Sequence, residues 1–295
     1  MLPERDRMGA VKRTIVFLIG LSLAGAAFGA DACDRACLRG FLTTYLDALV
    51  AHKPAAVPVA VNVKFTEDNV QKKLGEGLWQ TATKLRGFRQ DVLDVRQSTA
   101  ASLVVVEEGN SPALFTVRLK IADQKISEIE TMVVRTQAEG MIFQIDAIQT
   151  PSKAMNLEPP AGQKNSREEA IAVAVKYPGG LKVGSFVTSG AEFAPEAYRF
   201  ENGRLMAGPG CTFIAGCENI KGQRLPTLAG IKYREPIVDE EQGIVLLRMN
   251  FGPGSVRGPD PVLVPWEIFK VYGGQIHAVE AFMKVFPASM GTGWD

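Results

Sequence analysis

The chain has 295 residues, of which 46% are hydrophobic and 22% are charged, so its composition is that of an ordinary globular protein. Lysine and arginine number 33 against 32 aspartates and glutamates, and neither sign gathers in a long run. Nucleic-acid-binding proteins usually carry a basic stripe with interleaved aromatic residues, and this sequence has none. We therefore expect no nucleic-acid partner.

The N-terminus has the pattern of a secretory signal peptide. Lys12 and Arg13 precede an apolar run from Ile15 to Phe28 that ends in small residues, and cleavage is expected after Gly29 or Ala30. The run is short for a membrane span, although a single N-terminal anchor helix is the alternative. We assign residues 1–30 to a signal peptide and expect a periplasmic or secreted protein without a membrane span in its mature form.

The four cysteines fit an exported protein, because oxidising compartments allow disulfides to form. Of the three possible connectivities we favour the two local pairs, Cys33–Cys37 and Cys211–Cys217. The Cys33-x-x-x-Cys37 spacing could also supply metal ligands. A zinc site needs more ligands, however, and the chain has only two histidines. We therefore predict two disulfides and no metal site.

Residues 33–150 are predicted to form a helix followed by a sheet. Apolar residues recur at spacings of three and four between Asp34 and His52, which indicates a helix buried on one face. Val59–Phe65 alternates like a strand, and Gly75–Leu85 is expected to be a second helical segment. Four further strands are expected at Phe88–Arg96, Ala101–Glu107, Ala113–Ile121 and Ile126–Arg135. A helix followed by a curved antiparallel sheet is an α+β plan.

Residues 151–163 are rich in proline and are predicted to be a linker, so a second domain is expected over residues 164–295. That domain opens at Ser166, an N-cap candidate, with Glu169 three residues later completing a capping box. The glycine-rich segment Gly203–Gly222 is expected to be a loop tied by the second disulfide. Ile237–Phe251 is expected to form a hairpin.

The two predicted domains share short sequence patterns. Ile126-Ser127-Glu128-Ile129-Glu130 and Ile276-His277-Ala278-Val279-Glu280 have a common Ile-x-x-(Ile/Val)-Glu frame, 150 residues apart. Earlier in each half, Phe65-Thr66-Glu67-Asp68-Asn69 is echoed by Tyr198-Arg199-Phe200-Glu201-Asn202-Gly203. Two copies are too few for a solenoid, so the sequence predicts a tandem duplication of one domain.

A long amphipathic helix, a helical turn and a strongly bent sheet form the plan of the nuclear transport factor 2-like (SnoaL-like) superfamily. The chain resembles a tandem member, with two cone-shaped, cystatin-like domains. Short motifs resemble those of secreted bacterial and fungal double-domain proteins known mainly as a domain of unknown function: Cys33–Leu38, Phe65–Glu67, Leu74–Trp79, Val238–Gly243 and Met290–Trp294. The superfamily includes ketosteroid isomerase, scytalone dehydratase and polyketide cyclases, and also non-catalytic binding domains. The fold alone therefore does not settle the function.

Glu267 is the first candidate for catalysis, because it interrupts the apolar strand Val262–Val271. The resemblance implies that it lies near the place where ketosteroid isomerase carries an acid on its penultimate strand. Val117 stands at the matching place in the first half. The alternative is that Glu267 points outward and pairs with Lys270 or Lys284, since the strand period leaves its face undecided.

For three other titratable residues of the repeated strands, a catalytic role competes with a structural one. Glu130 and Glu280 alternate with the pocket-facing positions, so we interpret them as structural residues at the interface between the two sheets. His277 is a candidate general base. A residue just after a tight turn is, however, more often an exposed tip.

Polar and aromatic residues on the inner faces are the candidates for binding substrate. Tyr45 is expected to face the first cone, where Trp79, Phe88 and Arg89 would complete a pocket. Arg89 would bind an anionic or phenolic group, whereas core packing explains Trp79 and Phe88 equally well. The corresponding candidates in the second cone are Arg199, Glu201 and Arg248, with surface salt bridges as the alternative.

No phosphate-binding loop, dinucleotide fingerprint or zinc-protease motif occurs in the sequence, so we expect no cofactor. We predict an exported, cofactor-independent lyase or isomerase that acts on a small hydrophobic, aromatic or phenolic compound by proton abstraction or elimination. The alternative is a non-catalytic periplasmic protein whose duplicated cones bind a small molecule or serve as a scaffold, for example in a homodimer.

Overall fold

The computed structural model describes residues 33–258 and 260–294, which belong to one compact unit. The expected signal peptide lies outside the described residues. Within the described part, no helix is both long enough and apolar enough to cross a membrane.

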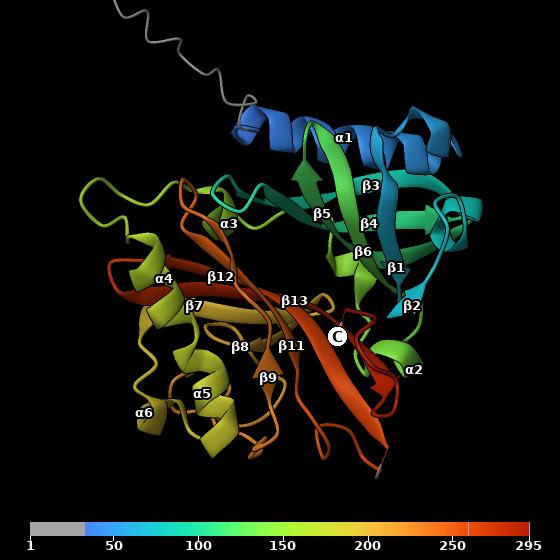
Figure 1. The fold of residues 1–295 in the computed structure, drawn as a ribbon. Coiled ribbons are helices and arrows are strands. Elements are labelled where there is room, and N and C mark those ends of the chain that lie inside the picture. Colours follow the sequence, from blue (N-terminus) through green and yellow to red (C-terminus); the bar gives the residue numbers. More distant parts are fainter. Residues whose placement is uncertain (1–32, 259, 295) are drawn as a thin grey trace, which may run out of the picture. The chain divides into compact units, whose positions relative to one another are not determined.

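The first half consists of one long helix over a six-stranded sheet (Figure 1). Helix α1 (Arg35–Val50) begins after Asp34, whose carboxylate accepts a hydrogen bond from the Cys37 N–H. The strand order is β2-β1-β6-β5-β4-β3. The strands are β1 (Val59–Glu67), β2 (Val70–Gln71), β3 (Ala82–Asp94), β4 (Thr99–Glu108), β5 (Ser111–Ala122) and β6 (Lys125–Val134). The 3₁₀ turns are η1 (Pro54–Ala56) and η2 (Gly77–Gln80).

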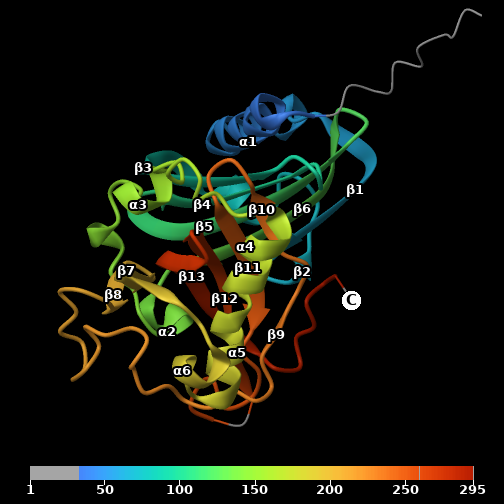
Figure 2. The same ribbon diagram turned by 90° about the vertical axis from the view of Figure 1, so that its left-hand side faces the viewer.

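The second half consists of three short helices beside a seven-stranded sheet (Figure 2). Helix α4 (Arg167–Ala174) begins with the predicted capping box of Ser166 and Glu169. Helices α5 (Lys176–Val183) and α6 (Phe186–Ser189) follow. The sheet order is β10-β11-β12-β13-β7-β8, and β9 pairs with β11. The strands are β7 (Phe193–Glu201), β8 (Arg204–Ala207), β9 (Lys232–Tyr233), β10 (Ile237–Asp239), β11 (Ile244–Asn250), β12 (Pro261–Tyr272) and β13 (Gln275–Pro287).

Short helical turns connect the two sheets. They are α2 (Gln137–Gly140), η3 (Ile145–Ala147) and α3 (Lys153–Asn156). The fold is α+β, as predicted, and both local disulfides, Cys33–Cys37 and Cys211–Cys217, are present. The second disulfide ties the glycine-rich loop after β8.

The structure corrects two sequence predictions. Both sheets are mixed rather than wholly antiparallel, because the first long strand of each half returns beside the last one in the same direction: β1 beside β6, and β7 beside β13. The predicted helix Gly75–Leu85 is only the 3₁₀ turn η2. Gly75 and Gly77 have positive φ angles, and strand β3 already begins at Ala82, so no regular helix can form.

The two sheets share one strand register. Thr66 lies opposite Glu130 in the first sheet, and Phe200 lies opposite Glu280 in the second. A two-residue turn with positive φ angles follows each of these first strands. In each turn the first side chain accepts a hydrogen bond from the last long strand: Val133 N–H to Asp68 at 2.9 Å, and Met283 N–H to Asn202 at 2.8 Å. The repeated motifs therefore occupy corresponding places.

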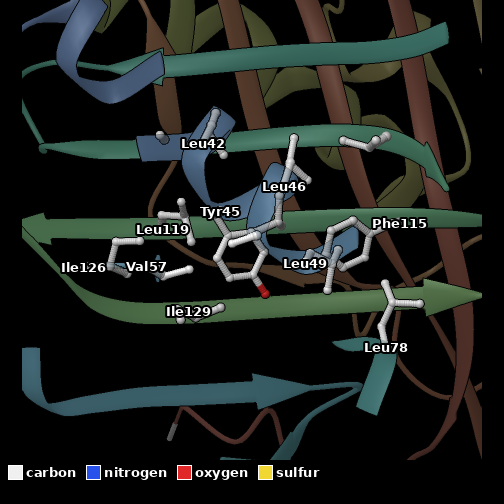
Figure 3. Packing of buried hydrophobic residues seen from close by; sticks show 14 of the residues in the cluster. Leu42, Tyr45, Leu46, Leu49, Val57, Leu78, Phe115, Leu119, Ile126 and Ile129 are labelled. Atoms are coloured by element: carbon white, nitrogen blue, oxygen red, sulfur yellow. The ribbon is translucent and has the colours of Figure 1, made fainter. Parts of the chain in front are cut away.

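The core of the first half lies between α1 and its sheet. Figure 3 shows Leu42, Leu46 and Leu49 of the helix among apolar side chains of the sheet. The Tyr45 hydroxyl accepts a hydrogen bond from Trp79 Nε1 at 3.1 Å, and the two rings meet edge to face with centroids 5.2 Å apart. Burial raises the pKa of Tyr45, so the hydroxyl stays neutral within this core.

A second core lies between the two sheets and draws residues from both. Phe88 of β3 and Phe282 of β13 meet there with ring centroids 5.7 Å apart. Two buried aspartates, one from each half, accept hydrogen bonds from the backbone of the other half. Asp94 accepts from Val238 N–H at 2.8 Å, and Asp239 accepts from Leu93 N–H at 3.2 Å. A third core, between the second sheet and helices α4–α6, contains the candidate site.

Candidate functional site

Glu267 lies on β12, on the face that α4–α6 cover. Alternate residues of this strand, such as Trp266 and Ile268, belong to the core between the sheets, whereas Phe269 belongs to the core under the helices. Glu267 shares the face of Phe269, since side chains two residues apart point the same way. Its strand neighbours are Leu247 and Ala281.

The Glu267 carboxyl is sealed from solvent. Its exposed fraction is 2%, and Oε2 has no hydrogen-bond partner within the described part of the chain. Burial raises the pKa of Glu267 to about 8 and the nearby charge of Glu201 adds to this, while Arg199 and a hydrogen bond with Tyr177 oppose it. The carboxyl is therefore mainly protonated at neutral pH.

Arg199 of β7 connects the polar groups around Glu267. Its Nη1 donates to the Tyr177 hydroxyl at 3.2 Å, and its Nε forms an ion pair with Glu201 Oε1 at 3.0 Å. Burial strongly raises the pKa of Tyr177, which keeps its hydroxyl neutral. We call these four residues, Tyr177, Arg199, Glu201 and Glu267, the Glu267 centre.

Three aromatic side chains surround the ring of Tyr177. Tyr177 packs on Phe186, Phe193 and Phe269, with ring centroids 4.8, 6.4 and 5.1 Å away. The surroundings are therefore apolar except for one neutral carboxyl, one neutral hydroxyl and one ion pair. A buried carboxyl whose pKa is raised by burial, next to an arginine ion pair in apolar surroundings, is an arrangement that acid–base catalysis uses.

The structure brings together three of the residues singled out from the sequence, Arg199, Glu201 and Glu267. It adds Tyr177, which was not among the candidates predicted from the sequence. The signal was present in the spacing, because Ala170, Ala174 and Tyr177 recur at intervals of four and three on the buried face. A buried tyrosine at the end of that stripe needs a hydrogen-bond partner.

Two other candidates of the second half lie elsewhere. Arg248 is on the opposite face of its sheet, where it pairs with Glu130 at 3.1 Å and donates to Asn69 at 2.6 Å. His277 is buried rather than an exposed tip. Its Nδ1 lies 2.7 Å from Glu196 Oε1, and its ring stacks on Tyr272. None of these contacts reaches the Glu267 centre.

The first-half candidates are also separated. Tyr45 and Trp79 lie together in the core under α1, but Phe88 points to the core between the sheets. Arg89 lies beside α1, where it donates to both carboxylate oxygens of Asp91, at 2.8 and 2.9 Å, and to Thr43 at 3.0 Å. These four side chains do not line one pocket.

Glu130 and Glu280 face away from the helix-covered cores. Glu130 accepts from Arg118 Nε at 3.1 Å and pairs with Arg234 and Arg248 of the second half. Glu280 accepts from the Tyr198 hydroxyl at 3.0 Å. Among residues 33–258 and 260–294, no cluster of three or more histidine, cysteine, aspartate or glutamate side chains is arranged to hold a metal ion.

Residues 163–283 are similar to a family described as a domain of unknown function, DUF8021. The matched segment contains all four residues of the Glu267 centre. The sequence finds no match among curated proteins.

Solved structures similar to this chain each cover 34% of it. A de novo designed protein with a curved β-sheet has 16% identity, 88% of its own chain covered and a TM-score of 0.28. A nuclear transport factor 2-like protein of unknown function from Cytophaga hutchinsonii has 9% identity, 91% coverage and a TM-score of 0.25. A proposed ketosteroid isomerase from Kribbella flavida has 16% identity, 78% coverage and a TM-score of 0.24. At these TM-scores the likenesses carry no conclusion about activity.

Proposed function

We propose that the second half is the catalytic domain of a cofactor-independent isomerase or lyase that acts on a small hydrophobic, aromatic or phenolic molecule. The observation that carries the proposal is Glu267 itself. A fully buried carboxyl with an unpartnered oxygen is costly to the fold unless it is functional. Its neighbours Arg199 and Tyr177 are the residue types that stabilise a developing oxyanion.

The proposed chemistry is a proton transfer next to a carbonyl group. Protonated Glu267 donates its proton to the substrate oxygen while the Glu201 carboxylate removes a proton from the adjacent carbon. The C–H electrons form a carbon–carbon double bond, which gives a neutral enol. Return of a proton to another carbon isomerises the substrate, and loss of a leaving group from the neighbouring carbon gives elimination.

Arg199 and Tyr177 serve this chemistry by holding charge in place. Arg199 is permanently charged and balances Glu201 before the reaction. When Glu201 takes up a proton and Glu267 loses one, the negative charge moves toward Tyr177, whose hydroxyl can donate to it. The dry surroundings strengthen each of these interactions.

Access to Glu267 requires movement of its cover. The carboxyl is 2% exposed, and the core on its face of the sheet includes residues of α5, α6 and the glycine-rich loop after β8, so we infer that one of these elements opens to admit a substrate. The phenylalanines around Tyr177 would then contact an apolar ring. This favours hydrophobic substrates over sugars or charged metabolites.

We also propose that the protein is an exported tandem repeat with a linker at residues 151–163. The two disulfides support an oxidising compartment, and the shared register of the two sheets supports duplication of one domain. In this proposal the first half is a structural copy, because Tyr45 is paired with Trp79 inside a packed core.

The proposal can be tested without knowing the substrate. Purified protein is incubated in D₂O with a panel of cyclic ketones, enones and phenols, and deuterium uptake at carbon is followed by NMR. We expect Glu267→Gln to lower the exchange rate on an active compound by about two to four orders of magnitude. Glu128→Gln is the control, since it makes the same change at a carboxyl outside the centre and has little expected cost to stability. Equal rates for Glu267→Gln and the unaltered protein would exclude Glu267 from the reaction.

Non-catalytic binding is the second candidate function, and the closed state of the Glu267 centre favours it. In that case a compound from the panel would bind and raise the melting temperature without deuterium uptake. Binding would then depend on Glu267 and Tyr177, while no compound would turn over.

A further inference from the structure

We propose that a pocket between the two sheets is a separate binding site for a neutral, single-ring molecule that carries one hydroxyl or carbonyl group. We call it the interface pocket. Its lining includes Phe88, Ile148, Ser152, Phe200, Glu280 and Phe282. It lies on the opposite face of the second sheet from Glu267, and it does not depend on the function proposed for that residue.

The size of the interface pocket selects a small ligand. Its volume is about 120 Å³. An engineered protein cavity of ~150 Å³ lined by apolar side chains binds benzene. One six-membered ring therefore fills the interface pocket, and because the pocket opens to solvent, part of a steroid or a diaryl compound would stay outside it.

The walls of the interface pocket are apolar and come from both halves of the chain. Phe88 is contributed by β3, Phe200 by β7 and Phe282 by β13. Ile148 follows η3 and closes another side. Such aromatic walls favour a flat ring, which can stack or meet them edge to face.

One end of the interface pocket is polar and already organised. Glu280 is 8% exposed and accepts a hydrogen bond from Tyr198, whose hydroxyl is also hydrogen-bonded to Ser152. Ser152 is fixed in turn as the N-cap of α3, where it accepts from Met155 N–H at 3.3 Å. A ligand hydroxyl or carbonyl placed here meets groups that can donate and accept.

The charge balance selects a neutral ligand. Among the described residues that line the interface pocket, none is a lysine or an arginine. Burial raises the pKa of Glu280, while hydrogen bonds from Ser152 and Tyr198 oppose the shift. A ligand carboxylate would face Glu280 with no cation to compensate it, so phenol should bind better than benzoate.

The test uses phenol, benzoate and toluene as probes in calorimetric titrations of the full protein. Ala147 lines the pocket and is exposed, so Ala147→Trp blocks it with little risk to the fold. We expect Ala147→Trp to lower phenol affinity at least tenfold. The control Ala56→Trp adds the same side chain at another exposed alanine and should change nothing.

A second variant tests the polar end. Glu280→Leu should weaken phenol binding by about three- to tenfold while toluene binding is retained, because only phenol loses a hydrogen bond. Crystals soaked in 4-bromophenol should show bromine in the interface pocket, beside Phe88 and Phe282. Glu267→Gln should leave this binding intact, which separates the interface pocket from the proposed catalytic centre.

Three results would overturn the proposal that the interface pocket binds a neutral single-ring molecule. Unchanged phenol affinity in Ala147→Trp would place the ligand elsewhere, and so would bromine located only beside Tyr177. Benzoate binding as tightly as phenol would contradict the selection for a neutral ligand.

Discussion

Val117 and Glu267 occupy the same position in the two sheets. Val117 lies opposite Thr131, and Glu267 lies opposite Ala281, so both pairs are offset by the 150 residues that separate Glu130 from Glu280. Each side chain faces a core covered by helices. One sheet thus carries an ordinary apolar residue where the other carries a buried acid, and four predictions bear on the Glu267 centre and on the junction between the sheets.

The first prediction concerns stability against pH. The folded state holds the Glu267 proton up to pH of about 8, whereas an unfolded chain releases it near its ordinary value of 4.5. The folded state therefore binds more protons between these values, and stability falls as pH rises through this window, by on the order of 4 kcal/mol. Glu267→Gln should remove most of this loss. Urea denaturation of the unaltered protein and of Glu267→Gln at pH 4, 6 and 8 measures the loss. The same dependence of unfolding free energy on pH in both proteins would contradict the raised pKa of Glu267.

The second prediction concerns the rate against pH. A general acid with a pKa of about 8 must be protonated to act, so kcat/KM should decline as pH rises through that value. Tyr177→Phe removes a hydrogen bond that lowers this pKa, and it should move the decline to higher pH. The measurement is a profile of kcat/KM from pH 5 to 10 on a compound found in the exchange screen. A decline that stays in place in Tyr177→Phe would show that another group titrates.

The third prediction uses the first sheet as an internal comparison. Val117→Glu places a carboxyl in a core where the strand neighbours are Ser102 and Thr131 and where no arginine corresponds to Arg199. We expect a loss of about 3 kcal/mol or more at pH 7, because the charge is buried without a partner. Val117→Thr has nearly the same shape and serves as the control. Equal unfolding free energies for the two variants would mean that this site is not dry.

Much of this architecture could be predicted because it follows from local patterns. The spacing of Leu38, Leu42 and Leu49 indicates the first helix, and the capping box at Ser166 fixes the start of another. The strands after Phe88 follow from β-rich runs between turns. The disulfides follow from pairs of cysteines that are close in sequence.

The remaining features depend on contacts between distant residues. The face of Glu267 was undecided, because strand alternation does not say which side a helix will cover. Arg248 was grouped with Arg199 although they lie on opposite faces, since only the register of β11 against β12 places it beside Glu130. The interface pocket needs side chains from β3, β7 and β13 at once, and no local pattern contains that information.

The last prediction concerns the junction between the sheets. Glu130 pairs with Arg118 of its own sheet and with Arg234 and Arg248 of the second half. Glu130→Gln removes the anion that these three guanidinium groups share. One of the three, that of Arg248, is buried. Removing one partner of a buried ion pair costs about 3–5 kcal/mol. We expect a loss near the lower end because Arg234 is partly exposed. Chemical denaturation gives the loss directly.

The control Glu128→Gln alters a more exposed partner of Arg118 and should cost less than about 1 kcal/mol. If the two variants lose equal stability, Glu130 does not hold the sheets together, and the junction depends on its apolar core and on the reciprocal contacts of Asp94 and Asp239.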